Sequence, residues 1–301
     1  MTDLCLIAGQ GRLPEILRAA YPDARIVGPV GDAPEGVETF RLEVLGSFLS
    51  ALAESGIRRV CLVGAIRRPV VDLSQIDEAT QPLVQRIVAA LGQGDDGALR
   101  VLVSLIEEAG MEVVGAADLC PDLLPPAGSL SAAEPTERDS RDLDRAMSVL
   151  DVTGPADIGQ GCVVAGGQVL AVETLPGTDW MLSSVAAMRR HVAPAGPARE
   201  MNLKSQTLEA LGLGGPGPAA ADEPDPDSLW APTPAGGVLA KAPKPGQDLR
   251  VDMPVIGPDT VRRAAAAGLS GIAVKAGGVM ALDRDEIARA ADSAGLWVRV
   301  V

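Results

Sequence analysis

The sequence predicts an α/β protein built from two domains, and three observations support this prediction. The chain has 301 residues, which exceeds the usual size of one domain. Short apolar runs alternate with stretches of helical periodicity along most of its length, as in sheets covered by helices. A segment rich in Pro and Leu, residues 121–131, interrupts the alternation. We therefore expect one α/β domain over residues 1–130 and a second over residues 131–301.

The N-terminal domain is predicted to be a parallel sheet covered by helices. Short apolar runs indicate buried strands at residues 4–8, 25–30, 59–63 and 111–114. Helical patterns follow at residues 14–20, 46–56, 81–91 and 97–109. Because helices separate these strands, neighbouring strands are expected to run parallel to one another.

A glycine loop follows the first strand. Gly9, Gly11 and Arg12 precede Pro14, and proline is favoured in the first turn of a helix. Backbone N–H groups at a turn from strand to helix can bind phosphate. The spacing is GxGxxP, so the third glycine of the dinucleotide fingerprint is missing. Two interpretations stay open: an ordinary turn, or a nucleotide loop in a Rossmann-like sheet.

Two further polar loops lie in this domain. Ile66 belongs to a loop that follows the strand at 59–63, and ligands of open α/β sheets bind beyond the carboxyl ends of strands. Gly94 and Asp95 precede the helix at 97–109, where an aspartate can cap the first turn. Each loop is either a ligand site or a solvated connection.

The C-terminal domain is predicted to be α/β as well, with a β-hairpin. Residues 161–174 form two apolar runs around Gly166 and Gly167, a pattern typical of a hairpin. Thr178 or Asp179 caps a helix after this hairpin. Further helices are expected at 136–150, 259–267 and 283–294, and strands at 271–275 and 296–300. Residues 212–236 are rich in Gly, Pro, Ala and Asp, which predicts a mobile insertion.

The densest charge cluster of the chain lies within residues 237–258. An apolar run ends at Lys241, Lys244 follows, and charged and apolar residues then alternate from Asp248 to Met253. Such alternation predicts a strand that places Asp248, Arg250 and Asp252 on one face. In an extended strand the two aspartates would lie about 13 Å apart, too far to share one ion.

Two interpretations of this cluster stay open. Lysine and arginine side chains bind phosphate, and carboxylates bind a metal ion or a water molecule. A charged edge strand facing solvent has the same pattern. For a metal at Asp252, either the strand bends at Gly246, or Asp252 pairs with a carboxylate from elsewhere, for which Asp95 and Asp179 are the candidates.

Composition excludes several classes of protein. The net charge is −14, which argues against a general nucleic-acid binder, and aromatic residues make up only 2%, too few for base stacking. No apolar run reaches the length of a membrane span, so we expect a soluble, cytoplasmic protein. The cysteines show no CxxC pairing, and Cys5, Cys61 and Cys162 lie in apolar runs that predict buried thiols.

Five motifs together resemble one enzyme family. They are the GxGxLP loop at 9–14, DIGQG at 157–161, VETLPGTDWML at 172–182, KAPKPGQDLRVDMPVIGPDT at 241–260 and GIAVKAGG at 271–278. The chain is similar over nearly its whole length to the UDP-2,3-diacylglucosamine pyrophosphatases of lipid A biosynthesis, of the LpxI type. The long motif at 241–260 is the most specific of the five.

The resemblance implies a reaction and a set of site residues. Members hydrolyse the pyrophosphate of UDP-2,3-diacylglucosamine with Mg²⁺, giving 2,3-diacylglucosamine 1-phosphate (lipid X) and UMP, and water attacks the sugar-side phosphorus. The family's essential aspartate falls on Asp252, which is therefore the expected catalytic and metal-binding residue. Lys241, Lys244 and Arg250 can neutralise phosphate charge. The remaining positions expected to bind substrate are Gly9, Gly11, Arg12, Ile66, Gly94, Asp95, Gln160, Thr178 and Asp179.

The resemblance also implies which part of the substrate each domain binds. The domain at 1–130 would bind UDP, and the domain at 131–301 would bind the acylated sugar and carry the catalytic residue. Acyl chains would bring the protein into peripheral contact with the inner membrane of a Gram-negative bacterium, and a homodimer stays open. The competing hypothesis is a nucleotide-sugar binding protein without catalysis. An NAD-dependent dehydrogenase is disfavoured because the glycine loop is incomplete.

Overall fold

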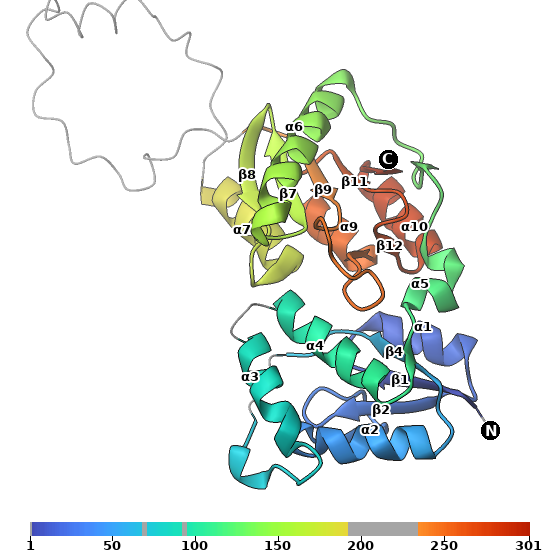
Figure 1. Ribbon diagram of the computed structural model, residues 1–301. Helices are drawn as coiled ribbons and strands as arrows, with labels where there is room; N and C mark the ends of the chain where they lie inside the picture. The colour runs from blue at the N-terminus through green and yellow to red at the C-terminus, as the bar shows by residue number, and fades with distance from the viewer. Residues whose placement is uncertain (1, 68–70, 92–94, 192–233) are drawn as a thin grey trace, which may run out of the picture.

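The computed structural model describes residues 2–67, 71–91, 95–191 and 234–301, and Figure 1 draws the rest as a grey trace. Two main sheets are present, one of five strands and one of six, each covered by helices. The fold is α/β, with a Rossmann-like N-terminal sheet and a C-terminal sheet that contains a hairpin, as the sequence predicts. Most of the predicted insertion at 212–236 lies outside the described residues.

The N-terminal sheet is entirely parallel, with strand order β3-β2-β1-β4-β5. This is the order of a Rossmann-like half, with the first strand at the centre. All five residues of β1 are buried, which explains why the strand is a continuous apolar run. The strands are β1 (Leu4–Ala8), β2 (Arg25–Pro29), β3 (Glu38–Phe40), β4 (Arg59–Val63) and β5 (Glu112–Val113).

Helices cover both faces of this sheet. Cys5 and Ile7 face one layer and pack with residues of α2 (Leu45–Glu54) and α4 (Asp95–Glu108). Leu6 faces the other layer and packs with α1 (Arg12–Ala20) and α5 (Ala116–Leu119). The helix predicted at 81–91 begins as a 3₁₀ turn, η3 (Gln81–Leu83), and continues as α3 (Val84–Leu91). The other short 3₁₀ turns are η1 (Leu42–Val44), η2 (Leu73–Gln75), η4 (Pro121–Leu123) and η5 (Gly154–Ala156).

The C-terminal sheet is mixed, with strand order β6-β13-β11-β9-β7-β8. The predicted hairpin is present, because β7 and β8 pair antiparallel around Gly166 and Gly167, both with positive φ. The sheet begins at Gly128, before the predicted boundary at 130. Its strands are β6 (Gly128–Ser129), β7 (Gly161–Ala165), β8 (Gln168–Val172), β9 (Val238–Lys241), β11 (Gly271–Val274) and β13 (Trp297–Val300).

Alternate residues of the C-terminal sheet face different helices. Leu239 and Ile272 pack with α7 (Gly177–His191), α9 (Pro258–Ala266) and α10 (Arg284–Ala294). Cys162 and Ala240 face the other side and pack with α6 (Glu137–Thr153). Lys241 follows Leu239 at period two, so its side chain enters the apolar layer of α7 and α9.

The two sheets share part of their cores. Two short strands, β10 (Val255–Ile256) and β12 (Met280–Ala281), form a separate parallel pair. Met280 and Leu282 belong to the same buried cluster as Leu6 of β1, so apolar side chains join the two halves of the chain. The segment between β9 and β10, drawn in orange, extends toward the N-terminal sheet (Figure 1).

The strand predicted at 248–253 is wrong. These residues form turns, in which the backbone N–H groups of Val251 and Asp252 both donate to the carbonyl of Asp248, at 3.1 and 3.0 Å. The carboxylate of Asp248 also accepts from the N–H of Arg250, a local bond that competes with a strand. The estimated separation of about 13 Å assumed an extended strand with a rise of roughly 3.3 Å per residue, so it does not apply.

The predicted buried thiols are confirmed. Cys5, Cys61 and Cys162 are buried and free of disulfides. Burial raises the pKa of Cys5 and of Cys61 to about 12 and that of Cys162 to about 11. Among the helices of the described residues, none is long and apolar enough to cross a membrane.

Candidate active site

Lys241 lies at the centre of a group of polar side chains at the end of β9. Its ammonium donates to Thr178 Oγ1 at 2.7 Å and to the carbonyl of Val255 at 3.3 Å. It also lies 3.8 Å from Glu173 Oε2, and the Lys241 side chain is only 7% exposed. The residue after strand β8, a residue of helix α7 and a residue of strand β10 are thus the three partners of the same buried cation.

The burial of Lys241 corrects the sequence-based view of this residue. The sequence predicts that Lys241 follows an apolar run and can neutralise phosphate charge, but β9 includes Lys241 and directs its side chain inward. Burial lowers the pKa of Lys241, and the charges of Glu173, Asp179 and Asp252 act in the opposite direction. The site therefore holds a desolvated cation surrounded by carboxylates.

Glu173 is a part of the site that the sequence did not indicate. Its Oε2 is buried and accepts no hydrogen bond from the residues that the structure describes. Two glycines of the DIGQG motif make room for it: a Cβ at Gly159 would lie 2.0 Å from the carbonyl oxygen of Glu173, and one at Gly161 would lie 2.4 Å from Oε2. The spacing GxG thus lets Glu173 pass close to β7.

Two glutamine amides hold Asp252. The Nε2 atoms of Gln247 and Gln160 approach Asp252 Oδ2 at 2.5 and 3.5 Å, so the first is a firm hydrogen bond and the second is at the limit of one. Gln160 also accepts a backbone bond from Ala242, which ties it to the chain just after β9. The sequence predicted Gln160 at the site but missed Gln247.

Lys244 is held by a carboxylate as well. Its ammonium donates to Asp157 Oδ1, and its backbone N–H donates to Gln247 Oε1 at 2.9 Å. Asp157 adopts a left-handed conformation with φ of 55°, which directs the chain into the DIGQG motif. We call Asp157, Gln160, Glu173, Thr178, Lys241, Lys244, Gln247 and Asp252 the Lys241 cluster.

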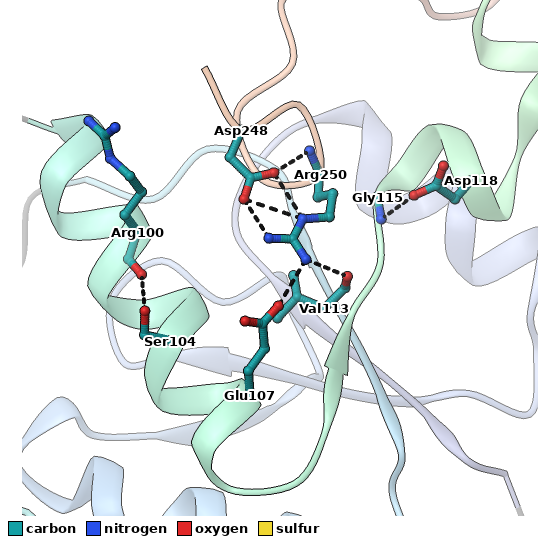
Figure 2. Close-up of polar contacts among 8 residues, drawn as sticks. All are labelled: Arg100, Ser104, Glu107, Val113, Gly115, Asp118, Asp248 and Arg250. Atoms are coloured by element: carbon teal, nitrogen blue, oxygen red, sulfur yellow. Dashed lines mark hydrogen bonds and ion pairs between the residues drawn. The ribbon is translucent and has the colours of Figure 1, made fainter. Parts of the chain in front are cut away.

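Arg250 does not join this cluster but ties its loop to the N-terminal sheet (Figure 2). Its guanidinium donates to both carboxylate oxygens of Asp248, to Glu107 Oε1 of α4 at 2.9 Å, and to the carbonyl of Val113 at 3.5 Å. These bonds raise the pKa of Arg250 and lower that of Asp248. A role for Arg250 in binding phosphate stays a prediction, and it would compete with these partners.

Arg12 also joins the two halves of the chain. Its guanidinium donates to Asp283 at 2.9 and 3.2 Å and to Glu15. Asp283 immediately precedes α10, so the pair connects the start of α1 with the start of α10. The predicted contact of Arg12 with substrate is untested, and its bonds in the structure are with protein carboxylates.

The glycine loop uses its amides internally. The N–H of Gly9 donates to the carbonyl of Val63, and the N–H of Gln10 donates to Ala65, both at 2.8 Å. A Cβ at Gly9 would lie 2.3 Å from the carbonyl oxygen of Ala65, so only glycine allows this approach. Gly11 has a φ of 109° and caps α1. Two of the N–H groups expected to bind phosphate are therefore engaged within the protein.

The remaining predicted positions divide between described and undescribed residues. Asp179 lies in the first turn of α7, is exposed, and forms an ion pair with Arg263 at 3.3 Å. Asp95 begins α4, although its side chain lies outside the described residues, as does Gly94. Among the described residues, no group of three or more His, Cys, Asp or Glu side chains could hold a metal ion.

Comparison with known proteins identifies the family. The LpxI N-terminal domain model matches residues 3–123, and the LpxI C-terminal domain model matches residues 126–209 and 220–299. The chain belongs to the LpxI family. A relative from Caulobacter vibrioides, the UDP-2,3-diacylglucosamine pyrophosphatase LpxI, is 33% identical over 308 residues, covering 99% of this chain and 97% of the relative. The resemblance seen in the motifs is thereby confirmed.

Proposed function

We propose that this LpxI-family chain hydrolyses the pyrophosphate bond of UDP-2,3-diacylglucosamine, releasing 2,3-diacylglucosamine 1-phosphate and UMP. The observation that carries the proposal is the pairing of Asp252 with two amide donors, in a loop beside the buried cation of Lys241. The named activity of the relative from Caulobacter vibrioides supports the same reaction.

The cations of the Lys241 cluster suit a phosphoryl transition state. Attack of water on phosphorus increases negative charge on the non-bridging oxygens, and fixed positive groups stabilise that charge. Lys241 and Lys244 supply local positive charge in a chain whose net charge is −14. Because Lys241 is buried, its interaction with phosphate is screened less than that of a surface lysine.

Asp252 is the group that acts on the water. An ionised carboxylate accepts hydrogen bonds only, so it can orient a water molecule and take up its proton as the new P–O bond forms. The amides of Gln160 and Gln247 fix the orientation of Asp252 Oδ2. A protein that only bound the nucleotide sugar would gain nothing from carboxylates such as Glu173 and Asp252 next to a pyrophosphate, because like charges repel.

The residues also fit Mg²⁺ that is shared with the substrate. Mg²⁺ commonly binds proteins through one or two carboxylates, with phosphate oxygens and water completing its coordination. Asp252 would hold the ion, with phosphate oxygens of the substrate as further ligands. The bound ion would supply neutralisation of phosphate charge.

Isotope labelling tests this proposal most sharply. The full chain is incubated with UDP-2,3-diacylglucosamine and Mg²⁺ in ¹⁸O-labelled water, and both products are analysed by mass spectrometry. We expect UMP and 2,3-diacylglucosamine 1-phosphate, with the label in the latter if water attacks the sugar-side phosphorus. Label in UMP would move the attack to the other phosphorus, and failure to form either product would overturn the proposed function.

A further inference from the structure

Glu173 carries a buried carboxylate to which the proposed reaction gives no role. It immediately follows β8, and its side chain is 14% exposed. Within the described part of the chain, its Oε2 atom accepts no hydrogen bond. Removing a carboxylate oxygen from water without giving it a donor is unfavourable, so such a group calls for an explanation. The neighbourhood of Lys241 supplies one.

The polypeptide makes room for this carboxylate. A Cβ at Gly161 would lie 2.4 Å from Glu173 Oε2 and 3.3 Å from the terminal methyl of Met181. Met181 belongs to α7 and is 1% exposed. The backbone N–H of Glu173 donates to the carbonyl of Gly161 at 2.8 Å, which fixes the start of the side chain. The carboxylate is therefore held beside a buried methionine, away from bulk water.

Lys241 lies close to Glu173 without a hydrogen bond between them. The distance of 3.8 Å from Lys241 Nζ to Glu173 Oε2 is too long for one. The ammonium donates instead to Thr178 Oγ1 at 2.7 Å and to the carbonyl of Val255 at 3.3 Å. An ammonium has three N–H groups, so these two bonds leave one of them for a further acceptor. Glu173 therefore acts on Lys241 through its charge, which water screens little in a buried site.

The other carboxylates near this ammonium are less suited to that task. Burial lowers the pKa of Lys241, and carboxylates oppose this effect, Glu173 most strongly. The other two are Asp179 and Asp252. Asp179 is 62% exposed and pairs with Arg263 of α9 at 3.3 Å, so solvent and a guanidinium both weaken its effect. Asp252 is the group proposed to act on water and Mg²⁺. Glu173 is thus the carboxylate best placed to keep Lys241 charged.

We propose that Glu173 is a positioning residue, whose carboxylate keeps Lys241 protonated and leaves one N–H of its ammonium for a phosphate oxygen of the substrate. The inference rests on the proposed function for the identity of that phosphate. A carboxylate in direct contact would take up the N–H and compete with phosphate, whereas a neutral side chain would let burial remove the proton. Glu173 acts on the reaction through Lys241 and does not itself contact substrate.

The protonation state of Lys241 can be measured without substrate. The chain has four lysines, so protein labelled with ¹³C at lysine Cε should give four NMR signals. Lys→Arg variants assign the other three lysines, and the remaining signal belongs to Lys241. We expect the pKa of Lys241 to be lower in Glu173→Gln than in the wild type by at least about one unit, because a buried opposite charge is lost.

Two further variants complete the NMR experiment. Glu137→Gln removes an exposed charge of α6 and is the matched control, which should leave the pKa of Lys241 unchanged. Glu173→Asp withdraws the carboxylate by one methylene and should give an intermediate pKa. It provides the same comparison if Glu173→Gln does not fold. An equal pKa of Lys241 in the wild type and in the Glu173 variants would overturn the inference.

Kinetics then test whether this charge serves the reaction. For hydrolysis of UDP-2,3-diacylglucosamine, kcat/KM should decline at alkaline pH as Lys241 loses its proton. In Glu173→Gln this decline should move to lower pH by the shift that NMR measures. A residue that merely stabilises the fold would lower the melting temperature without moving the decline. An unmoved decline, or a change confined to the Mg²⁺ concentration for half-maximal turnover, would overturn the inference; the latter result would make Glu173 a metal ligand.

Failure of the proposed function gives a different result. If the wild type forms no UMP from UDP-2,3-diacylglucosamine, the proposed function fails. A lowered pKa of Lys241 in Glu173→Gln would still support the role of Glu173 in keeping this buried lysine charged.

Discussion

The ammonium of Lys241 lies 3.8 Å from Oε2 of Glu173, with both groups almost entirely removed from solvent. Each charge stabilises the other, and breaking a buried pair leaves the second charge without compensation. Lys241 ends β9, and Glu173 immediately follows β8. The pair therefore links the stability of the C-terminal sheet to the proposed site.

Removal of the lysine alone should destabilise the fold. Lys241→Met keeps the volume but leaves Glu173 unpaired, and we expect a loss of about 3 kcal/mol in the free energy of unfolding, measured with urea. The double variant Lys241→Met with Glu173→Gln should recover most of this loss. Lys275→Met, at an exposed lysine, serves as the control and should change little. An unchanged free energy of unfolding in Lys241→Met would show that the pair is not buried in solution.

The lowered pKa of Lys241 predicts a dependence of stability on pH. The ordinary pKa of a lysine side chain is 10.5, and burial lowers the pKa of Lys241 in the folded state. Between the lowered pKa and 10.5 the unfolded chain binds more protons than the folded chain, so the free energy of unfolding rises with pH. Below the lowered pKa this destabilising contribution is fully present.

The matching experiment compares wild type with Lys241→Met by urea unfolding from neutral pH to 10.5. The stability of the wild type relative to the variant should increase with pH across this range. A relative stability that stays constant or decreases would contradict a desolvated lysine.

Arg250 should matter more for turnover than for stability. Its pair with Glu107 is exposed by 40% and 44%, so a double-mutant cycle should give a coupling of only about 0.2 to 1 kcal/mol. Arg250 nevertheless holds the turn in which Asp248 bonds the backbone of Asp252. Arg250→Gln should therefore lower kcat, by up to about 100-fold if Asp252 is displaced.

A matched control for Arg250 exists nearby. Arg86 forms an ion pair of similar exposure with Glu108, which follows Glu107 in α4. Arg86→Gln should leave kcat unchanged. If both variants behave alike, or if Arg250→Gln raises KM with normal kcat, Arg250 contacts substrate instead of positioning the loop.

Metal removal gives a separate prediction. We expect chelation by EDTA to abolish turnover and Mg²⁺ to restore it, because the Lys241 cluster provides only Asp252 as a proposed carboxylate ligand. Activity of Asp252→Glu should require a different Mg²⁺ concentration for half-maximal turnover, whereas Lys275→Met should not. Full activity in EDTA would mean that the lysines alone neutralise the phosphates.

Local patterns in the sequence predicted much of the fold. Apolar runs bounded by glycine or charge, such as Leu4–Ala8 and Arg59–Val63, are strands with those bounds. The hairpin around Gly166 and Gly167 is also confirmed, because two glycines favour such a turn. In these cases the information is contained within a few residues.

Other features depend on contacts that are distant in sequence. The 248–253 segment has the alternation of a strand but forms turns, because Asp248 bonds the local backbone and Arg250 binds α4. The burial of Glu173 depends on Gly159 and Gly161, and the whole hairpin of β7 and β8 separates these glycines from Glu173 in the sequence. No periodicity in the sequence reports such long-range partners.

The role of Asp252 in activating the attacking water is tested most directly by single-turnover hydrolysis of UDP-2,3-diacylglucosamine by Asp252→Asn. Asparagine keeps the size of the side chain and an acceptor for Gln160 and Gln247, but it can neither take up a proton nor bind Mg²⁺ as a carboxylate does. We predict a rate reduced by about 10² to 10⁴, with substrate binding and melting temperature close to those of the wild type. A rate close to wild type would contradict the assignment and place the attacking water elsewhere.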